Sequence, residues 1–127
     1  MSGPERELID PWIRRAEEDF INARYILTLQ EDCPLGTVCF HSQQCVEKYL
    51  KAWLVSLHIA FPKTHDLVEL MNLLSAPAKS SLEAEDLAVL NRYAIESRYP
   101  GHWEPIFRPE AEEAFAIAEK IRLLIRG

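Results

Sequence analysis

The sequence predicts an all-α protein, an up-and-down bundle of four long helices and one short helix. Apolar residues recur at positions i, i+3, i+4 and i+7 through most of the chain, which is the period of helices with one buried face. No stretch alternates with period two, and none is rich in the β-branched residues that favour strands. A chain of 127 residues has the length of one domain, so we predict a single helical domain over residues 1–127.

One predicted helix is strongly apolar. It follows a turn at residues 31–36 and ends near Ile59. Glu47 and Lys51 stand four residues apart on it, in the order that favours an ion pair along a helix. An apolar face as broad as this one is typical of a helix surrounded by other helices. We therefore expect this helix to be the centre of the bundle. Its apolar positions are Val38, Cys45, Val46, Tyr49, Leu50, Trp53, Leu54 and Leu57.

The first helix is predicted to start at Asp10 and Pro11, because an N-cap residue followed by proline is typical of a helix start. Its apolar face continues to about Gln30. Pro62 breaks the central helix, since proline disfavours helical geometry in the residue before it. Thr64 can then cap a short third helix.

The second half of the chain is predicted to hold two further helices. Residues 75–79 form a connection, after which Ser80 and Glu83 have the spacing of a capping box. The fourth helix should therefore start there and run to about Ser97. The last helix is predicted to begin near Pro109, after a loop that proline and glycine introduce.

The charge distribution limits where a polyanion could bind. The formal net charge is −6, which argues against binding of nucleic acid by bulk electrostatics. Most acids cluster near predicted helix N-termini, where they complement the helix dipole. Between residues 88 and 109, however, Arg92, Arg98 and Arg108 face only two glutamates. We expect a polyanion, if one binds, to contact this stretch.

The sequence predicts neither a membrane span nor a signal peptide. No apolar run is long enough to cross a bilayer, and residues 1–10 are charged and lack the apolar core of a signal peptide. We therefore expect a cytoplasmic protein with no membrane contact.

Metal and cofactor sites are not predicted. Cys33, Cys39 and Cys45 have no CxxC pairing and no matching histidine spacing, which indicates thiols rather than a disulfide or a zinc site. The four glycines are scattered, so no glycine-rich phosphate loop is present, and the four histidines share no ligand spacing. This pattern disfavours an oxidoreductase or a metal hydrolase.

Arg98 and His102 are the first candidate for chemistry, because they flank a proline–glycine turn at the end of the fourth predicted helix. Histidine can transfer the proton of an RNA 2′-hydroxyl or leaving group, and arginine can neutralise the charge that develops on phosphate oxygens. The alternative is structural: Arg98 pairs with a nearby glutamate, and His102 is an ordinary loop residue.

The second candidate is a polar row on the central helix. His41, Gln44 and Lys48 share one side of that helix, and Glu47 and His65 could contribute from nearby. Such a set could bind a phosphate group or the edge of a base. The alternative is a half-buried polar face that satisfies the backbone groups of a loop.

Three separated motifs stand in order along the chain: Phe40-His41-x-x-Gln44-x-x-Glu47-Lys48-x-Leu50-Lys51-Ala52, Pro62-Lys63-Thr64-His65-Asp66-Leu67-x-x-Leu70, and Tyr93 with Arg98-Tyr99-Pro100-Gly101. An alanine-rich last helix follows them. These motifs and the first predicted helix resemble those of HEPN domains, and the resemblance covers nearly the whole chain.

The resemblance implies a helical bundle that forms a homodimer. Many HEPN proteins are encoded beside a minimal nucleotidyltransferase, and such pairs often act as toxin and antitoxin. The toxic members are metal-independent endoribonucleases with an arginine and a histidine at the dimer interface. Arg98 matches that arginine, with Tyr99 beside it, whereas His102 follows at a shorter spacing than is typical of the family.

Three functions are therefore compatible with the sequence. The first is a HEPN-like module that binds a nucleotide or RNA or pairs with a nucleotidyltransferase. The second is a metal-independent endoribonuclease that uses Arg98 and His102. The third is a structural subunit whose apolar loop residues, Trp103 and Phe107, serve assembly or close the end of the bundle.

Overall fold

The computed structural model describes residues 3–94 and 105–126, and these residues form helices and no strands. The prediction of an all-α bundle is confirmed. None of the described helices combines the length and the apolar character that a membrane span requires. The helices are α1 (Gly3–Leu27), α2 (Leu35–Ser56), α3 (Leu67–Asn72), α4 (Ala76–Lys79), α5 (Ala84–Asn91) and α6 (Arg108–Arg126).

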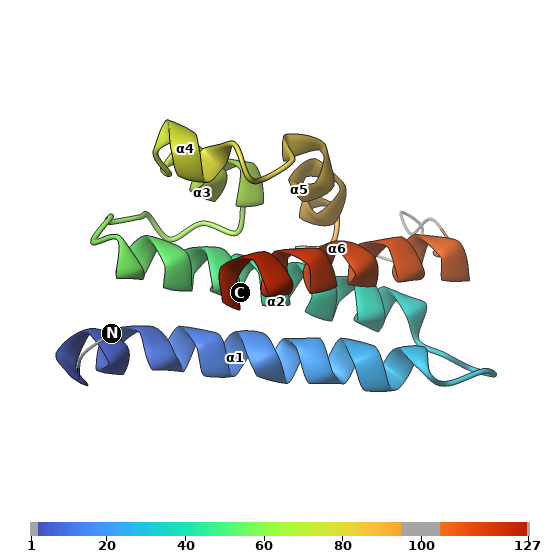
Figure 1. The fold of residues 1–127 in the computed structure, drawn as a ribbon. Helices are drawn as coiled ribbons and strands as arrows, with labels where there is room; N and C mark the ends of the chain where they lie inside the picture. Colours follow the sequence, from blue (N-terminus) through green and yellow to red (C-terminus); the bar gives the residue numbers. More distant parts are fainter. Residues whose placement is uncertain (1–2, 95–104, 127) are drawn as a thin grey trace.

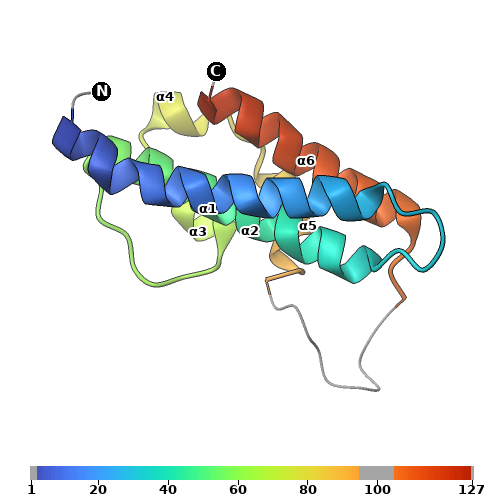
Figure 2. The same ribbon diagram turned by 90° about the horizontal axis from the view of Figure 1, so that it is seen from below.

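The three longest helices run along the length of the molecule. Figure 1 shows α2 and α6 running in the opposite direction to α1, and α2 contacts both of the others. The short helices α3, α4 and α5 lie on the side of α2 away from α1 (Figure 1). Seen from below, α1 extends along α2 over most of its length (Figure 2).

The prediction that the second helix is central is confirmed. The α2 helix contacts α1, α3, α5 and α6, and its side chains are buried over most of its length. Alanines on α1 and α6 face this core, and their small size lets the helices approach closely. The fully buried positions include Ala16, Ala23, Val38, Cys45, Val46, Tyr49, Leu54, Ala111, Ala114 and Ala118.

The start of α1 differs from the prediction. The helix begins at Gly3, so Asp10 lies inside it instead of capping it, and Pro11 is an interior helix residue. Ile9, just before this proline, is buried with 2% exposure. Burial of this apolar side chain supports the additional helical turns and outweighs the backbone hydrogen bond that Pro11 cannot donate.

The start of α3 also differs. Its N-cap is Asp66, whose carboxylate accepts from the backbone N–H groups of Val68 and Glu69. Thr64, the predicted cap, instead donates its hydroxyl to the Glu69 carboxylate and accepts from the backbone N–H of Asp66. Asp66 is the better-placed side chain because it directly precedes the helix.

The capping box predicted at Ser80 and Glu83 is absent. The Ser80 hydroxyl donates to the carbonyl of Pro77, and Glu83 precedes α5 without a side-chain capping bond. The segment predicted as a connection contains α4, with Pro77 in its first turn. The helix α5 ends at Asn91, earlier than predicted.

Candidate functional site

The predicted row on α2 is brought together by a residue that the sequence analysis did not select, Asp19 of α1. Asp19 Oδ1 lies 2.8 Å from His41 Nδ1, and Asp19 Oδ2 lies 3.4 Å from Lys48 Nζ. Lys48 Nζ also donates to Gln44 Oε1 at 2.6 Å. This half of the network joins α1 to α2. Asp19 could have been noticed, because it lies on the same helical face as the buried Ala16.

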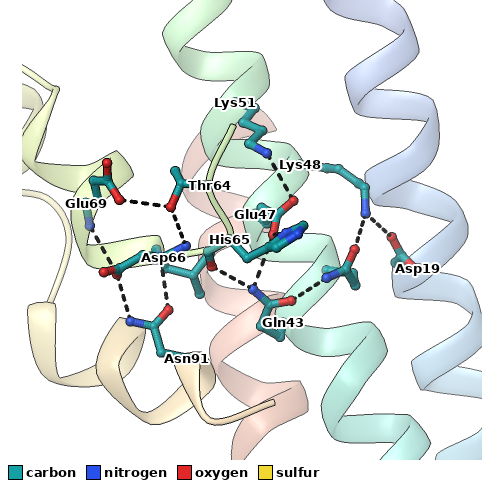
Figure 3. Close-up of polar contacts among 12 residues, drawn as sticks. Asp19, Gln43, Glu47, Lys48, Lys51, Thr64, His65, Asp66, Glu69 and Asn91 are labelled. Atoms are coloured by element: carbon teal, nitrogen blue, oxygen red, sulfur yellow. Dashed lines mark hydrogen bonds and ion pairs between the residues drawn. The ribbon is translucent and has the colours of Figure 1, made fainter. Parts of the chain in front are cut away.

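A second half of the network is centred on Glu47, whose side chain is only 4% exposed. Lys51 Nζ lies 3.2 Å from Glu47 Oε2, which confirms the predicted ion pair. The other carboxylate oxygen accepts from Gln43 Nε2 at 3.4 Å and lies 2.8 Å from His65 Nδ1. Figure 3 shows these side chains converging from α2 and from the segment before α3.

Gln43 and Gln44 join the two halves. Gln44 Nε2 donates to Gln43 Oε1 at 2.6 Å, and Gln43 Nε2 donates to the backbone carbonyl of His65 at 3.2 Å (Figure 3). All five predicted binding residues on α2 and before α3 therefore belong to one hydrogen-bond network. Gln43 is fully buried.

The segment that presents His65 is anchored to α5. Asn91 Nδ2 donates to the Asp66 carboxylate at 2.9 Å, and Asn91 Oδ1 accepts from the backbone N–H of Leu67 at 2.9 Å (Figure 3). The bend between α2 and α3 is thus fixed by side chains on both of its flanks. The sequence pattern gave no indication of this role for Asn91, because the role depends on the packing of α5 against α3.

Lys51 is buried beneath two aromatic rings. Its ammonium lies 5.6 Å from the ring centre of Trp12 and 5.8 Å from that of Phe61. Those two rings meet edge to face. A cation beside ring faces is stabilised by the ring quadrupoles, which adds to the ion pair with Glu47.

A separate cluster joins α1 to α2 and α6. The Glu17 carboxylate accepts two bonds from Arg122, at 2.7 and 2.8 Å, one from Arg126 at 2.6 Å, and one from the Tyr49 hydroxyl. The Arg122 hydrogen bonds are the main cause that lowers the pKa of Glu17 from 4.5 to about 2, with a smaller contribution from Tyr49. Partial burial acts in the opposite direction. This cluster ties α1 to α6 through one carboxylate that both guanidinium groups share.

The N-terminal end of α6 lies against the C-terminal end of α1. The Arg108 guanidinium donates to the carbonyls of Leu27 at 3.1 Å and Leu29 at 2.5 Å. Nearby, the Tyr93 hydroxyl donates to the carboxylate of Glu110. Burial, and then this bond to Glu110, raises the pKa of Tyr93, so the hydroxyl keeps its proton and remains a donor.

Three predicted site residues, Arg98, Tyr99 and His102, lie outside the described residues, as does Trp103. Their predicted roles stay predictions. Phe107 is described, and its side chain is 68% exposed. In residues 3–94 and 105–126, no three histidine, cysteine or acidic side chains form a group that could hold a metal ion.

Comparisons with known proteins agree with this architecture. A model of the HEPN domain family matches residues 9–127. The chain is also similar to the crystal structure of an archaeal HEPN homologue, with 26% sequence identity and a TM-score of 0.68. That similarity covers 94% of this chain and 95% of the archaeal chain. No curated protein matches the sequence. The chain belongs to the HEPN domain family.

Proposed function

We propose that this HEPN protein binds RNA or a nucleotide through phosphate groups, at the end of the bundle where α6 begins. The observation that carries the proposal is the pairing of Arg108. Its guanidinium donates to two backbone carbonyls, and no carboxylate of the described residues neutralises its charge. The nearest acid in sequence, Glu110, is already bonded to Tyr93. A positive charge of this kind favours phosphate.

The sequence supports the same location for the phosphate-binding site. Arg98, Tyr99 and His102 belong to the segment that connects α5 to α6, and both ends of that segment are fixed. Tyr93, just after α5, is bonded to Glu110 in the first turn of α6. We propose Arg98 as the principal additional phosphate contact.

Titration of a labelled RNA oligonucleotide and of a nucleotide tests this proposal. Arg98→Ala is expected to weaken binding about tenfold, because a hydrogen bond to a charged group contributes ~1.5 kcal/mol. It should also reduce the salt dependence of binding, since one phosphate contact is lost. Lys120→Ala is the matched control, because Lys120 pairs with Asp86 and belongs to a different part of α6. Equal weakening in both variants, or no binding by the original protein, would contradict the proposal.

A metal-independent endoribonuclease is the second candidate, favoured by Arg98 and His102 within the region that matches the HEPN family. His102 would move the proton of the 2′-hydroxyl or of the leaving group, and Arg98 would stabilise the charged phosphorus oxygens. RNA cleavage in EDTA with 2′,3′-cyclic phosphate ends is the expected activity. His102→Ala should abolish it without changing the helical content. An unchanged cleavage rate in this variant would eliminate the role given to His102.

We further propose that the protein acts as a homodimer and pairs with a minimal nucleotidyltransferase in a toxin–antitoxin-type system. The family membership supports this proposal, as do exposed apolar side chains such as Ile21, Tyr25 and Leu123. Sedimentation equilibrium and co-purification with a nucleotidyltransferase encoded beside it would test both points. A monomer without a co-purifying nucleotidyltransferase would argue against them.

A further inference from the structure

A cavity of about 490 Å³ lies between the last turns of α6 and the segment that leads into α5. Figure 1 shows this part of α6 passing below the connection between α4 and α5. The floor of the cavity is apolar, with Leu82 and Ile121 buried at 9% and 3% exposure. Leu123 and Leu124 are 60% and 42% exposed, so the cavity opens to solvent along α6. We name it the α6 pocket; its other lining residues are Ser81, Glu83, Asp86 and Lys120.

The polar edge of the α6 pocket carries an excess of negative charge. Lys120 Nζ lies 2.7 Å from Asp86 Oδ2 and 3.6 Å from Glu83 Oε1, so one ammonium group serves two carboxylates. The Glu83 side chain is 68% exposed and makes no capping bond to α5. Its carboxylate is therefore accessible to a positively charged group of a ligand.

Neighbouring cations do not offset this charge. Arg122 and Arg126, on the same turns of α6, are both paired with Glu17 on the α1 side of the helix. Lys79, which lies close in sequence to the pocket, donates to Asn72. The edge of the pocket thus keeps a negative potential, in a chain whose formal net charge is −6.

We infer that the α6 pocket binds an amphipathic helix of a partner protein, with a lysine or arginine beside the apolar row of that helix. The volume of the pocket accommodates several apolar side chains, and the two exposed leucines continue its apolar surface along α6. An amphipathic helix fills such a surface with residues at i, i+3, i+4 and i+7. Its basic residue pairs with Glu83, which is complementary in charge.

The inference does not rest on the proposed function, because it requires neither RNA nor a nucleotidyltransferase. The two surfaces also differ in charge. Arg108 supplies an un-neutralised positive charge at the start of α6, whereas the carboxylates of Glu83 and Asp86 outnumber Lys120 near its end. Like charges repel, so the α6 pocket disfavours a phosphate-rich ligand.

Fluorescence anisotropy of labelled synthetic peptides tests the inference on the full chain. The probe is a helical peptide with leucines at i, i+3 and i+7 and with lysines beside them. One control peptide has glutamate in place of each lysine, and another has serine in place of each leucine. Only the first peptide should bind, and its affinity should fall as salt is added, because salt screens charges at the surface.

The apolar contact is tested with a matched pair of leucine variants. Leu124→Ser should weaken binding of the peptide about tenfold, because apolar area that the complex buries is lost. Leu29→Ser is the control and should bind as the original protein does. Leu29 is 40% exposed, close to the 42% of Leu124, but it lies beside the opposite end of α6, where its carbonyl accepts from Arg108.

The charge contact predicts opposite effects for two further variants. Glu83→Gln should weaken binding about threefold, the effect of losing one exposed ion pair. Lys120→Gln should strengthen it by a similar factor, because Glu83 and Asp86 lose the ammonium group that they share. A loss of folding would weaken binding in both variants, and circular dichroism checks the helical content of each.

Equal binding of the lysine and glutamate peptides, or no binding of either, would overturn the inference. Equal weakening in Leu124→Ser and Leu29→Ser would do the same. Sedimentation of the chain alone gives a further check: self-association that Leu124→Ser abolishes would identify a second copy as the occupant and overturn the inference. Normal RNA binding by a Leu124→Ser variant that has lost peptide binding supports it, whereas RNA binding absent from every protein contradicts only the proposed function.

Discussion

Glu47→Ala should lower the free energy of unfolding by about 3–5 kcal/mol, the cost of removing one partner from a buried ion pair. Lys51 is 9% exposed and its ammonium lies beside the rings of Trp12 and Phe61, so an unpaired charge would remain largely buried. Gln43 and His65 also lose their carboxylate acceptor. Urea unfolding followed by circular dichroism would measure the change.

The double variant Glu47→Ala/Lys51→Met is the informative control. Methionine places an apolar chain of similar length where the unpaired ammonium would remain, so much of the lost stability should return. Lys48→Ala gives a second comparison, because Lys48 is more exposed and Gln44 and His41 remain in the network without it. A double variant no more stable than Glu47→Ala would show that the buried charge is not the source of the loss.

Acidification should also lower the free energy of unfolding by a large amount, because the carboxylate of Glu17 becomes protonated. Its pKa is about 2 in the folded protein and 4.5 in the usual reference state, so the folded state favours the ionised carboxylate. This contribution, about 3 kcal/mol at ~1.4 kcal/mol per pKa unit, is fully present above pH 4.5. It is lost progressively as the pH falls from 4.5 towards 2, because the unfolded chain takes up the proton first.

Unfolding free energies measured between pH 7 and pH 2 would reveal this dependence. Glu17→Gln should reduce stability at pH 7 and flatten the acid side of the profile, since the bonds from Arg122 and Arg126 no longer involve an ionised partner. Glu18→Gln, at the exposed neighbouring position, should leave the profile nearly unchanged. If both variants follow the profile of the original protein, Glu17 is not the group that governs the acid side.

The fold could be predicted from the sequence because helical periodicity is local and strong. The recurrence of Val38, Tyr49 and Leu54 identified the central helix, and these side chains are fully buried. Helix ends were predicted less well. Asp10 and Ser80 both have the chemistry of a cap, yet α1 extends past Asp10 and Ser80 bonds back to α4. Capping propensity is worth about 1 kcal/mol, which the burial of one apolar side chain can outweigh.

The site was predicted only in part, because sequence spacing shows neighbours along a helix but not across the bundle. His41, Gln44 and Lys48 were correctly placed on one side of α2. Asp19, the common partner of His41 and Lys48, belongs to α1, and nothing in the spacing of α2 indicates it. Asn91, which holds the segment before α3, is likewise far in sequence from its partner Asp66.

The sequence by itself determined that this chain is a helical bundle with α2 at its centre, and its motifs indicated the HEPN family, because both are carried by residues close together in the chain. Only the tertiary structure decided which polar side chains are exposed. Glu47 and Lys51 would be solvated on an isolated helix, but the segment after α2 and the Trp12 and Phe61 rings cover them. Because of this cover, Glu47 and Lys51 form a buried ion pair, whereas the ring of His65 remains at the surface.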